Sequence, residues 1–179
     1  TIPGEHNRKN ATLIIEALKH MSTSANKSAI YQAINSFPGS GRRFEKLADN
    51  LYSDYGHHPI EIRATLQMAR ELSDQVVLVY QPHQNVRQHE IIDQYTADIF
   101  RDADEVYWLP TYLTRENPDL PILTPQQLTK NIGPEKLHFA KLDDNLWQNI
   151  TTAQKSGKLV LCMGAGTIDG WIREQLAKD

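Results

Sequence analysis

Short apolar runs that alternate with amphipathic segments constrain the fold of this chain more than any other feature. The runs at residues 76–80 and 158–162 are mainly apolar, which is typical of strands covered on both faces. Each is followed by a segment whose apolar residues have helical spacing. Strands that alternate with helices predict an α/β fold with a mostly parallel sheet and helices on both of its faces.

An early pair of strands adds one antiparallel element. Predicted strands at 43–48 and 51–54 flank Asp49-Asn50, a plausible hairpin turn, and indicate an antiparallel edge strand. The other predicted strands are 76–80, 104–108, a short one near 137–139, and 158–162. The predicted helices are 5–22, one that Ser24 caps and that ends near Asn35, 60–72, 88–102, 125–131, 143–155 and 167–177.

The size and composition of the chain restrict its function classes. Its 179 residues suffice for one domain, and the opening Thr1-Ile2-Pro3-Gly4 indicates a domain excised from a longer protein. A net charge of −3 offers no basic field for nucleic acid, and the apolar runs are too short to span a membrane. The one cysteine, Cys162, lies in an apolar run, which predicts a buried residue and a reducing, cytoplasmic compartment.

Three polar segments follow predicted strands, where ligands of open parallel sheets bind. They are 54–59, 81–87 and 164–167, and we expect them to converge. The Gly164-Ala165-Gly166 turn lacks the third glycine of a dinucleotide-binding loop, which argues against a dehydrogenase-like domain. The sequence has neither a P-loop nor histidines at metal-ligand spacing, so we expect no metal site.

The densest chemistry lies in the segment that begins at Asp54. Asp54-Tyr55-Gly56-His57-His58-Pro59 brings a carboxylate, a phenol and two imidazoles to the start of a predicted helix. Helix N-termini suit anions, and proline fits the first helical turn. A surface pair of histidines beside a simple turn is the alternative reading of these residues.

Polar residues elsewhere have similarly divided readings. Asn7 and Asn10 carry amides that complement the hydrogen-bonding edge of adenine, although Asn7 could simply cap a helix. Arg42-Arg43 could bind phosphate or carboxylate, or form a solvated basic turn. Arg87 is an anion ligand or a surface ion-pair partner.

Taken together, five motifs resemble one family in order and spacing. The chain is similar to the C-terminal domain of the Mur ligases, and in particular to the branch that acts on UDP-N-acetylmuramate and L-alanine and its murein-peptide-recycling relative. The family motifs GxHNxxN, GRRF, DYGHHPTE, QPHRYTR and MGAG correspond to Gly4–Asn10, Gly41–Phe44, Asp54–Glu61, Gln81–Arg87 and Met163–Gly166.

The resemblance implies a function for the whole protein of which this chain would be a part. Mur ligases are three-domain, ATP-dependent amide ligases of peptidoglycan synthesis, which form an acyl phosphate that the incoming amine attacks. The N-terminal domain binds the UDP-sugar, and the central domain holds most of the ATP and its Mg²⁺. The third domain is a Rossmann-type sheet, expected here over 1–179 as a single domain, and alone it should be inactive.

The resemblance also implies roles for individual residues. Asn7 and Asn10 would contact adenine and nearby phosphates, and Arg43 would approach the ribose and the phosphates. Asp54 would accept hydrogen bonds from the ribose hydroxyls, with Tyr55 beside the base.

A second set would hold the carboxylate of the incoming amino acid. It consists of His57 or His58 together with Arg87, because a carboxylate favours guanidinium or imidazolium donors. Gln84 stands where the family has arginine, and Asn85-Val86 replace its Tyr-Thr pair. The loss of one guanidinium leaves open which amino acid is joined, and whether the biosynthetic or the recycling reaction applies. A non-catalytic nucleotide-binding module that reuses the fold is the remaining alternative.

Overall fold

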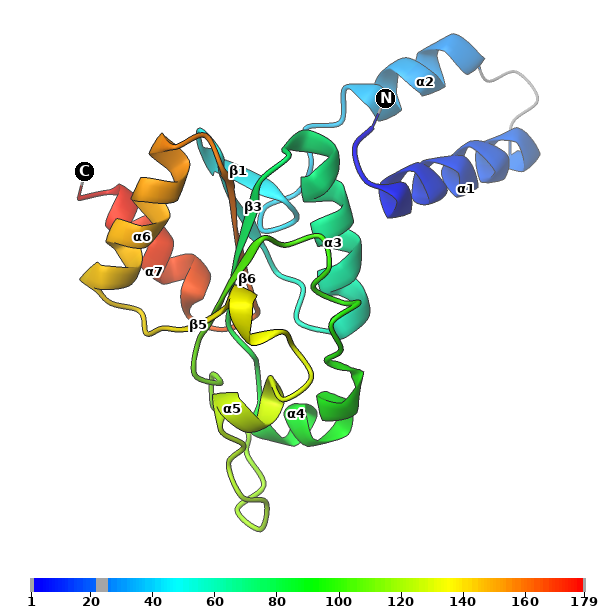
Figure 1. Cartoon of the computed structure of the whole chain (residues 1–179). Coiled ribbons are helices and arrows are strands. Elements are labelled where there is room, and N and C mark those ends of the chain that lie inside the picture. The colour runs from blue at the N-terminus through cyan, green and yellow to red at the C-terminus, as the bar shows by residue number, and fades with distance from the viewer. Residues whose placement is uncertain (1, 22–25, 179) are drawn as a thin grey trace.

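A six-stranded sheet organises the chain in the computed structural model, which describes residues 2–21 and 26–178. Its strand order is β1-β2-β6-β3-β4-β5, with β1 antiparallel to β2 and the other neighbours parallel (Figure 1). The predicted α/β fold with an antiparallel edge strand is therefore confirmed. The strands are β1 (Glu45–Ala48), β2 (Leu51–Asp54), β3 (Val76–Tyr80), β4 (Glu105–Trp108), β5 (Leu137–Phe139) and β6 (Leu159–Met163).

The register of the parallel strands aligns their carboxyl ends. Asp54 pairs with Met163, Met163 with Tyr80, and Tyr80 with Trp108. The segments that follow β2, β3 and β6 consequently leave the sheet at the same edge. The predicted convergence of the three polar segments is confirmed.

Helices cover both faces of the sheet, as predicted. One face is covered by α3 (Pro59–Leu72), α4 (Asn85–Ile91) and α5 (Pro125–Leu128), and the other by α6 (Asp144–Lys155) and α7 (Ile168–Leu176) (Figure 1). Two 3₁₀ turns, η1 (Ile92–Gln94) and η2 (Pro134–Lys136), complete the connections.

The side chains of β3 show how one strand serves both cores. Val76, Leu78 and Tyr80 face the core beneath α3, whereas Val77 and Val79 face the core beneath α6 and α7. All five are buried because each face of the strand has its own helical layer. Cys162 lies in the second core, where burial raises the pKa of its thiol, which confirms its predicted role as a buried residue.

The predicted helix at 88–102 is wrong in its second half. Helix α4 ends at Ile91, η1 ends at Gln94, and turns follow. At that point the chain turns inward, so that Tyr95 and Phe100 become fully buried beside Trp108. Burial of two aromatic rings outweighs a few more residues of regular helix.

Several predicted boundaries also shift. Strand β1 begins at Glu45 rather than at residue 43, because Arg42 and Phe44 adopt positive φ angles of 56° and 50°. Helix α2 (Lys27–Asn35) is capped by Asn26, whose side chain accepts a hydrogen bond from the N–H of Ser28. The predicted cap, Ser24, lies outside the described residues. The predicted helix at 125–131 ends at Leu128.

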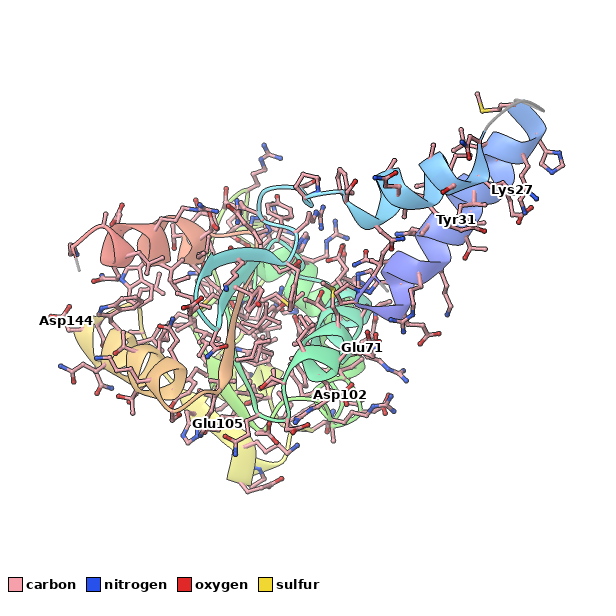
Figure 2. All side chains as sticks on the ribbon, turned by 90° about the horizontal axis from the view of Figure 1, so that it is seen from above. Lys27, Tyr31, Glu71, Asp102, Glu105 and Asp144 are labelled. Atoms are coloured by element: carbon pink, nitrogen blue, oxygen red, sulfur yellow. The ribbon has the colours of Figure 1, made fainter. Side chains whose placement is uncertain are left out.

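Helices α1 (Glu5–Met21) and α2 project from the body of the chain as a pair (Figure 1). Lys27 and Tyr31 lie at the far end of this pair, away from Glu105 and Asp144 in the body (Figure 2). The two helices contribute no buried residue to either core. Within the described ranges, every helix is too short or too polar to cross a membrane.

The helical pair is joined to the body at the base of α1. Both terminal guanidinium nitrogens of Arg8 donate to the carboxylate of Glu71 on α3, at 2.8 and 2.7 Å. The N–H of Gly4 also donates to Glu71, and the N–H of Glu5 donates to Gln67. Hydrogen bonds from Arg8, Gly4 and Gln67 lower the pKa of Glu71 to about 2.

This pKa predicts a pH-dependent attachment of α1. A carboxylate whose pKa falls on folding stabilises the native state above its unfolded pKa and loses that contribution as the pH falls. We expect Glu71→Gln to lower the thermal midpoint at neutral pH, with the difference from wild type shrinking between about pH 4.5 and about pH 2. Thermal unfolding across this range measures it. Glu174→Gln is the control. If the thermal midpoint of Glu71→Gln differed from that of wild type by the same amount at every pH, the Glu71 carboxylate would not be the group that attaches α1.

Candidate functional site

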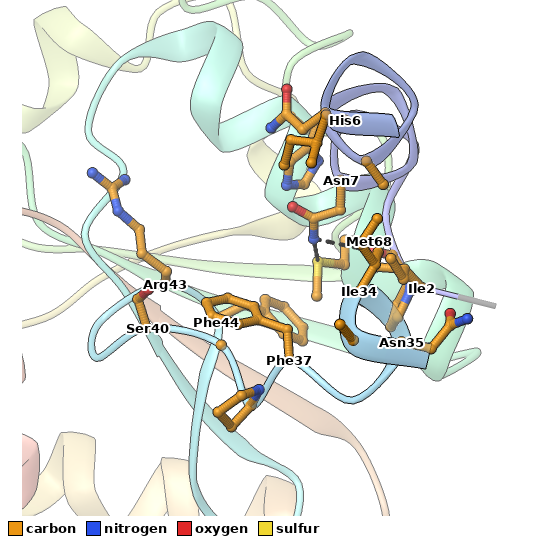
Figure 3. Close-up of a pocket in the computed structure, with 18 of the residues that line it drawn as sticks. Ile2, His6, Asn7, Ile34, Asn35, Phe37, Ser40, Arg43, Phe44 and Met68 are labelled. Atoms are coloured by element: carbon orange, nitrogen blue, oxygen red, sulfur yellow. Dashed lines mark hydrogen bonds between the residues drawn. The ribbon is translucent and has the colours of Figure 1, made fainter. Parts of the chain in front are cut away.

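A cavity of about 1390 Å³ lies between the helical pair and the body of the chain (Figure 3). Its walls come from α1, α2, the segment 37–44, Asp54 and residues 60–68 of α3. Apolar and polar residues both line it, as is usual for small-molecule sites. The lining includes Ile14, Ile30, Ile34, Phe37, Phe44 and Met68, and the polar residues Asn7, Asn10, Asn35, Ser40, Arg43 and Asp54.

Four of the five residues predicted to bind the nucleotide line this cavity. Asn7 and Asn10 lie on α1, and Arg43 lies across from Asn7 in Figure 3. The fourth is Asp54, at the end of β2. The fifth, Tyr55, is not part of the lining, but its ring lies beneath the guanidinium of Arg43 at 5.5 Å.

The side chain of Asn7 does not cap a helix. It lies inside α1, where its amide nitrogen donates to the carbonyl of Pro3 at 3.1 Å and contacts Met68 Sδ at 3.4 Å. The capping alternative is therefore wrong. Both contacts use the amide nitrogen, so among the described residues the amide oxygen stays available to a ligand donor.

His6 is a lining residue that the set of sequence candidates omitted. Its Nδ1 atom is buried and has no hydrogen-bond partner among the described residues. Burial lowers the pKa of the ring, so the neutral imidazole is favoured. A signal was present in the sequence, since His6 belongs to the GxHNxxN motif, but one buried ring nitrogen cannot be read from a sequence.

Asp54 organises the wall of the cavity. Its Oδ2 accepts the N–H of Phe44 at 2.8 Å, and its Oδ1 accepts the N–H of Gly56 at 2.7 Å. Burial raises the pKa of the carboxyl group, although these two donors oppose the rise. The carboxylate thus fixes the turn that presents Arg43, and each oxygen retains a lone pair for a further donor.

Arg42, which precedes Arg43, has a structural role. Arg42 Nη2 donates to the carbonyl of Gly164 at 3.0 Å, and its Nε lies 3.5 Å from Asp169. The Arg42-Arg43 pair is therefore divided, with Arg42 tied to the β6 turn and Arg43 at the cavity.

His57 and His58 are joined through Glu61. One carboxylate oxygen of Glu61 accepts both backbone N–H groups, at 2.9 and 3.0 Å. Burial alone would raise the pKa of Glu61, but these two donors lower it. His58 caps α3, since its Nδ1 accepts the N–H of Ile60 at 3.4 Å, and Pro59 occupies the first helical turn as predicted. His58 thus has a structural role as the cap of α3.

His57 begins a row of rings along the sheet edge. Its ring centroid lies 5.5 Å from that of His83, which stacks on Tyr112 at 5.7 Å. Burial, and then the neighbouring His57, lower the pKa of His83. His83 and Tyr112 were both missed as candidates, because the loop that carries Tyr112 joins the site only through tertiary contacts.

A family model described as "Mur ligase, glutamate ligase domain" matches residues 42–166. The chain belongs to the Mur ligase family. The resemblance drawn from the five motifs is confirmed.

Individual Mur ligases agree with this placement. The UDP-N-acetylmuramate–L-alanine ligase of Jannaschia sp. (strain CCS1) is 33% identical over 177 residues, which cover 95% of this chain and 37% of that protein. The solved UDP-N-acetylmuramate-alanine ligase MurC of Thermotoga maritima has a TM-score of 0.70 at 25% identity, covering 99% of this chain and 38% of that one. A murein peptide ligase of Psychrobacter arcticus 273-4 shares the fold, with a TM-score of 0.58 at 23% identity, 99% coverage of this chain and 37% of its own. The chain thus spans 37% of the length of the curated relative.

The candidate carboxylate ligands of this Mur ligase chain are not all brought together. Arg87 is half-exposed on α4, and within the described chain its guanidinium bonds Glu90 Oε2, at 2.6 Å, rather than either imidazole. Gln84, which replaces the family arginine, precedes α4 with a φ of 60°. The side chain of Asn85 is buried and ties the 121–123 segment, accepting from Leu123 N and donating to Pro121 O. The departure from the Mur ligase motif at 85 therefore has a structural role.

An internal carboxylate covers the start of α4. Glu116 accepts the N–H groups of Asn85, Val86 and Thr114 at 2.8–3.3 Å. The loop at 110–122 is thereby held against the sheet edge. The first two N–H groups of α4 are therefore taken by an acceptor of the chain itself.

The glycines of the MGAG motif permit close packing. A Cβ atom at Gly164 would lie 2.6 Å from the carbonyl oxygen of Gln81, and one at Gly166 would lie 2.7 Å from Tyr112 Cβ. Gln81 Oε1 accepts the N–H of Ile168, and Gln81 Nε2 donates to Thr167. In this Mur ligase chain the segment is a packed strand-to-helix turn.

The donor chemistry here does not form a cation site. Among residues 2–21 and 26–178, acidic and metal-binding side chains do not gather in groups of three or more. We therefore assign no Mg²⁺ ligand to these residues. What the edge offers instead is amide, imidazole and guanidinium groups, which bind and orient anions and heterocycles.

Proposed function

We propose that this chain is the C-terminal domain of an ATP-dependent ligase that joins L-alanine to UDP-N-acetylmuramate in peptidoglycan synthesis. The observation that carries the proposal is that Asn7, Asn10, Arg43 and Asp54, far apart in sequence, line one cavity. The names of the curated relative and of the Thermotoga maritima structure support the choice of substrates.

The cavity suits the adenosine part of a nucleotide. Apolar side chains from α1, α2 and α3 would cover the faces of the base, and the amides of Asn7 and Asn10 would meet its polar edge. Asp54 would accept a ribose hydroxyl, and the guanidinium of Arg43 would approach a phosphate. The unpartnered Nδ1 of His6 offers one more acceptor to the bound group.

The sheet edge would orient the second substrate. His57, with Arg87 one turn into α4, would hold the carboxylate of the amino acid, while His58 caps α3. Arg87 must leave Glu90 to do so, which costs little because a half-exposed ion pair contributes only about 0–1 kcal/mol. The contribution of this chain to catalysis is positioning and charge stabilisation.

Two variants of the full-length protein separate the two halves of the proposal. We expect Asn10→Ala to raise the KM for ATP about ten-fold with little change for L-alanine, since it removes one nucleotide contact. Arg87→Ala should raise the KM for L-alanine at least about ten-fold and that for ATP little. Steady-state kinetics at saturating co-substrates measure both.

Arg101→Ala is the matched control. Arg101 is as exposed as Arg87 and forms the same i,i+3 ion pair, with Asp98. Its substitution should leave both constants unchanged. Equal effects of Arg87→Ala on both substrates would refute the carboxylate assignment, and turnover with a muropeptide but not with L-alanine would favour the recycling reaction.

A further inference from the structure

A buried row of polar side chains lies between the backbone of His57 and that of His83. The hydroxyl of Tyr80 donates to the carbonyl of His57 at 2.9 Å and lies 2.9 Å from the hydroxyl of Tyr95. Tyr95 donates to Gln88 Oε1 at 2.8 Å, and Gln88 Nε2 donates to the carbonyl of His83 at 2.9 Å. Three side chains thus join two loops that follow different strands.

The three linking side chains are fully buried. Tyr80, Tyr95 and Gln88 each have 0% exposure, and the ring of Trp108 packs on both tyrosines, with centroids 5.0 and 5.1 Å away. Polar groups at such a depth are costly unless they are hydrogen-bonded. Phenylalanine and leucine would fill the same core without polar atoms, so packing alone does not account for the hydroxyls and the amide.

This row of side chains ends at the two loops that carry the imidazole rings of His57 and His83. Tyr80 is the last residue of β3, and it reaches across to the turn after β2. Gln88 lies on α4 and reaches back to the residue that precedes Gln84. The ring centroids of His57 and His83 lie 5.5 Å apart, and the backbone carbonyls of the same two residues are the groups that Tyr80 and Gln88 hold.

The number of hydroxyl and amide hydrogens that each linking residue can donate gives these residues different roles. Burial raises the pKa of both phenols, so each keeps its one hydrogen. A carbonyl can only accept, and therefore the hydrogen of Tyr80 belongs to His57 and one amide hydrogen of Gln88 belongs to His83. Tyr95 then has one hydrogen for two acceptors, Tyr80 and Gln88. Neither loop carbonyl depends on Tyr95.

We propose that Tyr80 and Gln88 are positioning residues, which hold the His57 and His83 loops at the separation that the incoming amino acid requires. The proposal rests on the proposed function, because that function places the substrate carboxylate at His57. Tyr95 supports the core and is not a positioning residue.

Two matched substitutions in the full-length protein test this assignment. Tyr80→Phe and Tyr95→Phe each remove one fully buried hydroxyl, and both should lower the thermal midpoint. Only Tyr80→Phe frees a loop carbonyl, and it should raise the KM for L-alanine about five- to ten-fold, the effect of one hydrogen bond. The KM for ATP should stay unchanged in both variants, and Tyr95→Phe should leave the KM for L-alanine within about two-fold of wild type.

A second readout does not depend on the function of the chain. In protein labelled at histidine, the NMR signals of the His57 ring should move in Tyr80→Phe and stay in place in Tyr95→Phe. Unchanged His57 signals in Tyr80→Phe would overturn the positioning role, whatever the chain does. Moved signals with an unchanged KM for L-alanine would overturn the placement of substrate at His57. An equal rise of that KM in both variants would mean that Tyr80 acts only through core packing, like Tyr95.

Discussion

Replacing Asp54 with alanine should lower the free energy of unfolding by about 3 kcal/mol, because a buried carboxylate that accepts two backbone N–H groups is lost. One of these donors belongs to Phe44, whose positive φ of 50° makes its turn dependent on outside support. The turn carries Arg43, so the variant should also bind ATP more weakly. Denaturant unfolding and ATP titration of the full-length protein measure the two effects.

Asp49→Ala provides the control for this prediction. Asp49 lies in the turn between β1 and β2, its side chain is 97% exposed, and it forms an ion pair with Lys46. Its replacement should change stability by less than about 0.5 kcal/mol. If Asp54→Ala were as mild as Asp49→Ala, the two backbone bonds would not be holding the turn.

Replacing Gly166 with alanine should lower the free energy of unfolding by about 1–3 kcal/mol through overpacking. The added Cβ would lie 2.5 Å from Gln81 Oε1 and 2.7 Å from Tyr112 Cβ. Relief would displace either the acceptor that Ile168 uses or the ring on which His83 stacks. The KM for L-alanine should therefore rise along with the loss of stability.

Gly170→Ala should have the opposite sign. Gly170 lies inside α7, and a Cβ there would meet no atom within 4 Å. Alanine in a helix interior should stabilise the chain by about 0.5–1 kcal/mol. Denaturant unfolding of Gly166→Ala and Gly170→Ala distinguishes a steric clash from a general effect of replacing glycine by alanine. Destabilisation of similar size at both positions would contradict the steric explanation.

The layered sheet was predictable because its signals are local. The continuous apolar run of β3 and the Asp49-Asn50 turn specify strand type without knowledge of distant residues. The prediction of a helix over 88–102 was wrong in the part whose structure depends on residues that are distant in sequence. Ile91 and Tyr95 have the spacing of a helical face, but partners on β3 and β4 draw Tyr95 and Phe100 inward.

The candidate site was predictable by residue type and less so by geometry. The motifs supplied Asn7, Arg43 and Asp54, whose meeting at one cavity depends on how α1 and α2 leave the body. Nothing local shows that Arg42 turns to Gly164 while Arg43 does not. The part played by Tyr80 and Tyr95 was invisible for the same reason, since two tyrosines 15 residues apart meet only when the chain turns back.

The position of β6 has a consequence for how this chain is made. Strand β6, the last of the six strands in sequence order, lies between β2 and β3, and it is the element that attaches the β1–β2 hairpin to the rest of the sheet. Until residues 159–163 are synthesised, β2 and β3 both present open edges that can pair with other chains. The sheet can therefore assemble only after residues 159–163 have been synthesised, and the two edges stay open to pairing with other chains during that interval.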